Sequence, residues 1–181
     1  EPVKVIGKCS AEKHGTKVTF HPDPTIFEDT VYDYDTLKQR LRETAFLTKG
    51  LRIVLSDARV DPVHTHEFHY AGGIKEFVTY LNKSKEALYP EVIYCEGTRD
   101  GVYVEVAMQH NDSYNDATYS FVNNIITPEG GTHLAGFRNA LTKTFNTYAR
   151  ANKILKDTEP ALTGDDIREG LTAIISIKIE E

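Results

Sequence analysis

The segment from Thr132 to Asn152 constrains the fold of this chain more than any other part of its sequence. Apolar side chains recur along one side of a helix drawn at about 100° per residue: Leu134, Phe137, Leu141, Phe145 and Tyr148. Most of the stability of a helix in water comes from burying such a stripe against another element. The sequence therefore predicts a long amphipathic helix and a second apolar layer beside it.

Short runs of β-type composition supply that second layer. Residues 92–94 and 102–108 alternate in polarity on either side of Arg99-Asp100-Gly101, and an Asp-Gly pair favours a tight hairpin. Further strands are predicted at residues 117–125 and 171–179, and shorter helices at residues 74–81 and directly after Thr163. We therefore expect an α+β sandwich with helices on one face of a mostly antiparallel sheet.

The first part of the chain is predicted to form a separate domain. Residues 3–6 and 17–20 are predicted to be a pair of strands, Tyr34–Leu47 a helix, and residues 51–55 and 67–70 two more strands. The polar stretch of residues 56–67 is the plausible boundary. We therefore expect one domain at residues 1–67 and another at residues 68–181.

Composition narrows the functional classes. With 40% hydrophobic and 27% charged residues, the chain can build a core. Its net charge of −6 argues against a free-standing nucleic-acid binder but leaves room for a local basic patch. No apolar run approaches the roughly 20 residues that span a bilayer, so we expect no membrane partner. The two cysteines, far apart in sequence, favour reduced thiols in a cytosolic protein.

Four strings of residues occur together in the order that is specific to one family. They are RLRETAFL at residues 40–47, FHYAGGIKEF at 68–77, NNI at 123–125 followed by EGGTHLAGFR at 129–138, and TGDDIREGL at 163–171. Together they span most of the chain, which resembles the B subunit of bacterial DNA gyrase, a type II topoisomerase. The B-type subunit of topoisomerase IV is similar in the same region.

The resemblance implies a fold for each domain. Residues 68–181 would be most of the family's transducer domain, similar to a ribosomal-protein-type β-α-β sandwich with a left-handed crossover, against the usual right-handed preference. Residues 1–67 would be the incomplete end of the α/β sandwich of the GHKL ATPase domain. We therefore expect an internal piece of a longer protein. Residues 1–68, lacking the rest of their sheet, should expose apolar surface or pair with a neighbour.

The resemblance also implies a function. The parent enzyme would hydrolyse ATP and negatively supercoil DNA in the cytoplasm. Its transducer passes the nucleotide state to the DNA-cleaving part and lines the cavity for the transported duplex. The implied partners are double-stranded DNA, the gyrase A subunit, and a second B subunit that dimerises on ATP binding.

Site residues follow from the same resemblance. Gly15 and Thr16 resemble the family's last nucleotide-site motif, where the threonine hydroxyl helps to hold adenine and Val18 lines the pocket. Arg138 matches the arginine that faces the DNA cavity, where it would neutralise phosphate. From the residues alone, a local salt bridge on the helix flank is an equal alternative for Arg138.

ATP and Mg²⁺ are the cofactors of the parent family. Its catalytic glutamate, Mg²⁺-binding asparagine and glycine-rich lid would lie upstream of residue 1, and its γ-phosphate lysine just after Glu181. ATP hydrolysis needs a base, a metal and charge stabilisation at the transferred group. We therefore expect this segment to be catalytically inactive and to bind neither cofactor strongly.

Other functional classes stay open from the residues alone. A stand-alone interaction module could use the same sandwich. His64, His66 and His69 could form a metal site, although no carboxylate or cysteine completes the ligand set. Asp165 and Asp166 could suggest Mg²⁺ binding, but interaction with the positive N-terminal end of a helix is the favoured role. Residues 130–132 favour a tight turn over a phosphate cradle, because no P-loop lysine follows.

Overall fold

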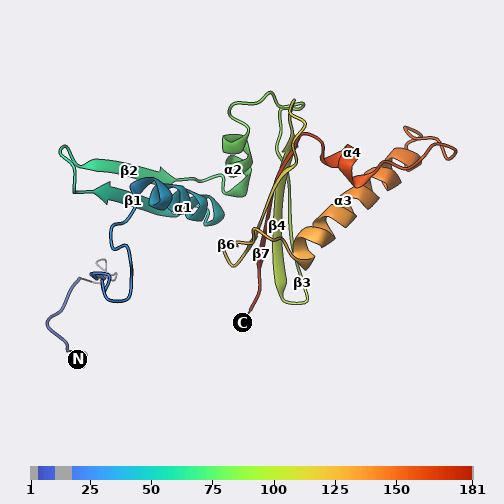
Figure 1. The fold of residues 1–181 in the computed structure, drawn as a ribbon. Helices are drawn as coiled ribbons and strands as arrows, with labels where there is room; N and C mark the ends of the chain where they lie inside the picture. The colour runs from blue at the N-terminus through green and yellow to red at the C-terminus, as the bar shows by residue number, and fades with distance from the viewer. Residues whose placement is uncertain (1–3, 11–17, 181) are drawn as a thin grey trace. The chain divides into compact units, whose positions relative to one another are not determined.

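A computed structural model describes residues 4–10 and 18–180 of the chain (Figure 1). It divides into two compact units, Glu1–Asp33 and Tyr34–Glu181. This division lies before the helix that begins at Tyr34, so residues 34–67 belong to the same unit as the larger sheet. The boundary expected at residue 67 stays a prediction about the domains of the intact protein.

The first unit shows why β-type composition alone does not make a strand. Residues 4–10 and 18–33 contain no strand or helix, so the strand pair expected at residues 3–6 and 17–20 is wrong wherever the structure describes it. Val5, Ile6, Val18 and Phe20 are between 70% and 100% exposed. The exposed apolar surface expected for this part is therefore confirmed. Such runs need partner strands to satisfy their backbone groups and to cover their side chains.

The second unit begins with a helix that packs on a hairpin. Helix α1 spans Tyr34–Leu47, as expected, and strands β1 (Arg52–Asp57) and β2 (His64–His69) pair in antiparallel register. Phe68 on β2 is fully buried, and the Arg42 guanidinium of α1 lies 5.9 Å from the centre of its ring. The strands expected at residues 51–55 and 67–70 therefore exist, with shifted ends.

Five strands form the main sheet in the described part of the chain, in the order β3-β4-β7-β5-β6. Their bounds are Ile93–Arg99, Val102–His110, Leu171–Lys178, Ala117–Val122 and Ile125–Ile126. Neighbours are antiparallel except β5 and β7, which are parallel. Asp100 and Gly101 make the β3–β4 turn with φ of 51° and 79°, as a tight hairpin requires.

The strand expected at residues 117–125 is instead a hairpin. Asn123 and Asn124 have φ of 48° and 66°, a left-handed conformation that asparagine tolerates better than most residues. The chain therefore reverses after β5, and β6 pairs back on it through Phe121 and Ile126.

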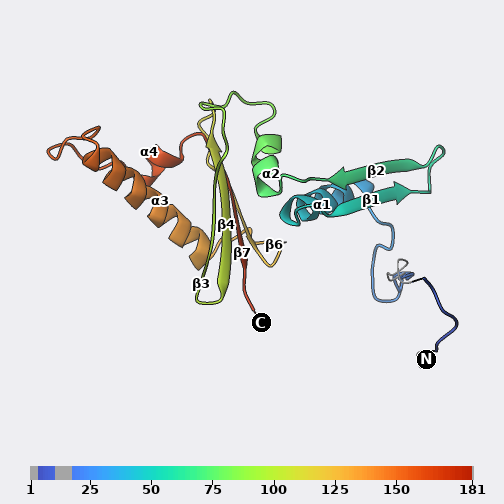
Figure 2. The same cartoon turned by 180° about the vertical axis from the view of Figure 1, so that it is seen from behind.

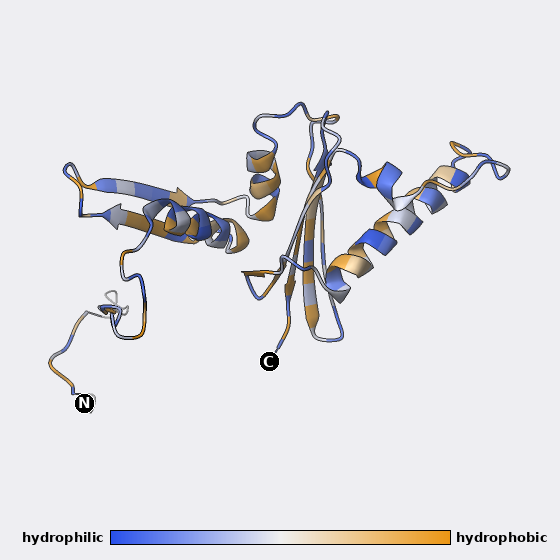
Figure 3. Cartoon of the chain, in the orientation of Figure 1, coloured by the Kyte–Doolittle hydropathy of each residue, from blue (hydrophilic) through white to orange (hydrophobic). Residues whose placement is uncertain are grey.

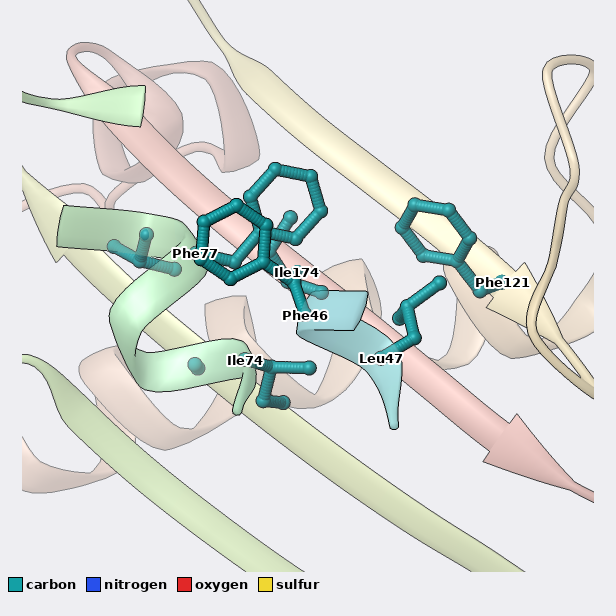
Figure 4. Packing of buried hydrophobic residues seen from close by; sticks show 8 residues of the cluster. Phe46, Leu47, Ile74, Phe77, Phe121 and Ile174 are labelled. Atoms are coloured by element: carbon teal, nitrogen blue, oxygen red, sulfur yellow. The ribbon is translucent and has the colours of Figure 1, made fainter. Parts of the chain in front are cut away.

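Helices pack on both faces of the sheet, so the expectation of helices on one face is wrong (Figures 1 and 2). Helix α2 (Ile74–Leu81) and the end of α1 cover one face, where Phe46 and Phe77 meet Ile174 of β7 (Figure 4). Helix α3 (Thr132–Ala151) and the short α4 (Gly164–Arg168) cover the other, where Leu141 and Ile167 meet Leu171 and Ala173. Successive side chains of a buried strand point to opposite faces of the sheet, so both faces of β7 must be covered by helices.

Hydrophobic residues mark the central strands and the helices that cover them (Figure 3). On the α3 side they leave an apolar groove of about 810 Å³, lined by Val104 and Ile177 of the sheet and by Phe137 of α3. No helix among the described residues is long and apolar enough to cross a bilayer. The α+β class is confirmed, and the left-handed crossover stays a prediction.

The carboxylate of Asp57, the last residue of β1, has a lowered pKa that can be tested. Arg59 donates from Nε and Nη2 to the two Asp57 oxygens at 2.8 and 2.7 Å, and from its backbone N–H at 3.0 Å. These bonds favour the ionised form and lower the pKa of Asp57 from 3.8 to about 2. Because the pKa is lowered in the folded state, this contribution to stability is present above pH 3.8 and is lost as pH falls through about 2.

We expect a carboxyl-carbon NMR titration to give Asp57 a midpoint near that lowered value, with Arg59→Gln returning it toward 3.8. An unchanged midpoint in the variant would contradict the assigned cause.

Candidate nucleic-acid interface

Arg138 lies on α3, the helix predicted from the apolar stripe. Leu141 of the stripe is buried, and Phe137 and Phe145 pack on the sheet beside it. Tyr148, further along the same stripe, is 63% exposed. Arg138 follows Phe137 and is therefore turned to the flank of the contact, where its side chain is 40% exposed. The helix begins after Gly130 and Gly131, whose φ of 75° and 150° make the turn expected there.

The guanidinium of Arg138 is paired with an acid. Its Nη2 donates to Oδ2 of Asp116 at 3.1 Å, so the salt bridge weighed from the sequence is present. Its Nε is buried and has no hydrogen-bond partner among the residues that the structure describes. A buried N–H donor without an acceptor is uncommon and costs free energy.

A second arginine shares the same acid. Arg168 of α4 donates from Nε to the same Oδ2 of Asp116 at 3.1 Å, and from Nη2 to Asp165 at 2.7 Å. The other Asp116 oxygen accepts from the Thr118 hydroxyl. Asp116 directly precedes β5, so three separate elements meet at one carboxylate.

Helix α4 is fixed by its own N-terminus. The Thr163 side chain accepts from the Asp166 N–H, and the Asp166 carboxylate accepts from the Thr163 N–H, which is a complete capping box. The Thr163 hydroxyl also donates to the Asp166 carboxylate, and this bond, followed by that from the Thr163 N–H, lowers the pKa of Asp166. Asp166 therefore serves the helix end, as the sequence suggested, and Asp165 pairs with Arg168.

The predicted nucleotide residues are not assembled into a site by the structure. Gly15 and Thr16 lie outside the described residues. Val18 is 76% exposed and belongs to the first compact unit, whereas Arg138 belongs to the second. The nucleotide role of these three residues therefore stays a prediction.

His64 and His66, two of the three histidines weighed as metal ligands, have aromatic neighbours. The ring of His64 stacks on Tyr34 at 4.4 Å, and that of His66 lies 4.5 Å from Phe68. Burial, together with the charges of Lys38, Arg42 and His64, lowers the pKa of His66. Among the residues that the structure describes, no three histidine, cysteine or acidic side chains gather to hold a metal.

Sequence reasoning missed Asp116 and the role of Arg168. Arg168 stood within the TGDDIREGL string, but its partner lies 52 residues earlier. Asp116 belongs to no string, and its only sequence signal is its place directly before a strand. The pairing follows from topology, because α3 and α4 come between the parallel strands β5 and β7.

Comparisons with known proteins agree along nearly the whole chain. The family model described as DNA gyrase B matches residues 73–181. The chain is 56% identical to the DNA gyrase B protein of Clostridium acetobutylicum over 181 residues, covering 99% of this chain and 28% of that protein. It is 52% identical to the DNA gyrase B protein of Halalkalibacterium halodurans, again covering 99% of this chain and 28% of that protein.

Solved structures share the fold. The 43K ATPase domain of Thermus thermophilus gyrase B, in complex with an aminocoumarin, superposes with a TM-score of 0.76 at 36% identity. That match covers 88% of this chain and 43% of the other. The topoisomerase IV ATP-binding domain of Francisella tularensis gives 0.69 at 24% identity, which shows a shared fold alone.

Proposed function

Because the chain belongs to the DNA gyrase B family, we propose that it is the segment of such a protein that joins the end of the ATPase domain to the transducer domain. It spans 28% of the length of the curated relatives named above. The parent enzyme would be an ATP-dependent type II topoisomerase in the cytoplasm. Its partners would be double-stranded DNA, the gyrase A subunit and a second copy of the B protein.

The role of this segment is mechanical coupling between nucleotide and DNA. One observation carries this proposal: Phe46 and Leu47, at the end of α1, are buried in the same cluster as Phe121 of β5 and Ile174 of β7. A packed core transmits displacement with little compression. Movement of α1 with the nucleotide domain would therefore be passed to the central strands and on to the DNA-cleaving part.

Arg138 would contact the backbone of the transported duplex. Its side chain is 40% exposed, and the exposed end of a guanidinium suits phosphate oxygens. In the parent, Gly15, Thr16 and Val18 would contribute to the ATP site. The 181-residue chain alone would bind ATP and Mg²⁺ weakly and would not hydrolyse ATP. Calorimetric titration is expected to give no micromolar affinity for ATP with Mg²⁺.

The direct test uses a complete gyrase B protein carrying this segment, assembled with its A subunit. We expect Arg138→Ala to reduce both DNA-stimulated ATP hydrolysis and supercoiling. Lys143→Ala removes one exposed cation from the same helix and should leave both at the wild-type level. Equal losses in the two variants would argue against a specific contact at Arg138. A wild-type assembly that relaxes DNA without supercoiling it would favour the topoisomerase IV alternative.

A further inference from the structure

Asp116 is an acid that lies against Arg138, the residue proposed to contact DNA. Both oxygens of its carboxylate accept hydrogen bonds, Oδ2 from Arg138 and Arg168 and Oδ1 from Thr118. The two guanidinium groups therefore converge on a single oxygen, each at 3.1 Å. Two cations held this close repel one another unless an anion lies between them.

We propose that Arg138 and Arg168 form one phosphate-binding site, and that Asp116 is its built-in counter-ion, with which DNA phosphate competes. The inference rests on the proposed contact of Arg138 with DNA. It adds Arg168 as a second cation, and Asp116 as an acid that lowers the affinity of the site for DNA. Arg138, with 40% of its side chain exposed, is the more accessible cation of the site, and Arg168, with 17% exposed, is the more buried one.

The unused donors argue for a ligand beyond Asp116. Asp116 accepts from Nη2 of Arg138 alone, and 40% of the side chain is exposed, so the guanidinium keeps donors that a ligand from solvent can reach. A phosphate has more acceptor oxygens than a carboxylate and can bridge two guanidinium groups. Bidentate arginine–phosphate pairing would satisfy donors that the carboxylate leaves unmet.

The placement of the site makes it rigid. Arg138 is carried by α3, Arg168 by the capped α4, and Asp116 by the start of β5. Helices α3 and α4 lie side by side (Figures 1 and 2). Two cations already in position lose little side-chain entropy on binding, which favours a fixed backbone contact over transient attraction.

The charges of the two arginines and two aspartates explain why the site would bind DNA weakly. Asp116 and the exposed Asp165 together offset Arg138 and Arg168, so the site is near neutral before DNA arrives. A neutral site binds DNA weakly and releases it readily, which suits an enzyme that must let a transported duplex pass. Removing the Asp116 charge while keeping its shape would expose both cations to phosphate.

The test measures binding of the 181-residue chain to a short fluorescent DNA duplex over a salt series. We expect Asp116→Asn to bind roughly three- to tenfold more tightly and to steepen the slope of log K against log salt by about 0.9, as one more effective cation would. Asparagine can still accept from both arginines, and Thr118 can turn its hydroxyl to accept from the amide. Arg168→Gln should weaken binding and flatten the slope by about the same amount.

Asp157→Asn is the matched charge control. Asp157 is 99% exposed and pairs at 3.9 Å with Arg150, which lies 12 residues along α3 from Arg138, or about 18 Å at 1.5 Å per residue. That is about two screening lengths at physiological salt, so this variant should bind as wild type does. Thermal unfolding of every variant is followed by circular dichroism, so that loss of fold is not counted as loss of binding.

The outcomes separate the two proposals. If Arg138→Ala changes neither affinity nor slope, or if no variant binds duplex at the lowest salt, the DNA contact and this inference both fail. If Arg138→Ala weakens binding but Asp116→Asn and Arg168→Gln leave affinity and slope unchanged, the inference alone fails.

Discussion

Replacing Phe46 with alanine is expected to lower the free energy of unfolding by about 3–5 kcal/mol, the usual cost of removing a buried phenylalanine side chain. The Phe46 side chain is 1% exposed, and its ring stacks on Tyr70 at 3.6 Å and on Phe77 at 4.5 Å. Its loss would leave a cavity where α1, α2 and the sheet meet. Denaturant unfolding, followed by circular dichroism, measures the change.

Phe27→Ala is the matched control for that experiment. Phe27 is 55% exposed in the first compact unit, so the same chemical change should alter the free energy of unfolding by well under about 1 kcal/mol. A similar cost for the two variants would contradict the central place assigned to Phe46. In the assembled enzyme, Phe46→Ala should also reduce supercoiling more than ATP hydrolysis, because it loosens the link between α1 and the sheet.

Gly170→Ala is expected to cost about 3 kcal/mol or more, the second large effect. Gly170 has φ of 70°, which L-residues disfavour by about 1–2 kcal/mol. An added Cβ would clash with the Asn111 carbonyl oxygen and would lie 2.6 Å from that of Ser113. Both are backbone atoms and cannot move aside, and the Gly170 carbonyl must also accept from the Asn111 N–H at 2.9 Å.

Gly136→Ala is the control for Gly170→Ala, and it is expected to raise the free energy of unfolding. Gly136 is within α3, and an ideal Cβ there meets no described atom within 4 Å. Alanine should stabilise the helix by about 0.5–1 kcal/mol. The comparison is made from denaturant midpoints at constant slope. A Gly170→Ala variant as stable as wild type would show that the turn into β7 can relax.

Periodic elements could be predicted from the sequence because their signals are local. The bounds of α1 and α2 follow from apolar spacing within the segments themselves, and Asp100-Gly101 specifies its hairpin by backbone preference alone. The strands expected near residues 3–6 and 17–20 are wrong because a strand depends on partners that local composition does not report. The turn at Asn123-Asn124 escapes prediction because the β-type residues around it outweigh its own turn preference.

Long-range polar contacts could not be predicted. Asn82, Asn111 and Thr172 form a buried hydrogen-bonded cluster whose members lie 29 to 90 residues apart. The Asp116 site has the same character. Nothing in the neighbourhood of such residues distinguishes them from exposed polar residues, and only the order of the strands brings them together. The family resemblance supplied the predicted site residues Gly15, Thr16, Val18 and Arg138. The structure pairs Arg138 with an acid, Asp116.

The order of the sheet has a consequence for synthesis. β7 is the last strand of the described chain, yet it lies between β4 and β5. A ribosome delivers residues from the N-terminus, so both flanking strands emerge before the strand that joins them. Until residues 171–178 have left the exit tunnel, Ala107 and Phe121 have no central neighbour, and the nascent chain is exposed to aggregation. This sheet therefore closes only after β7 has emerged, and its dependence on chaperones should be greatest just before that point.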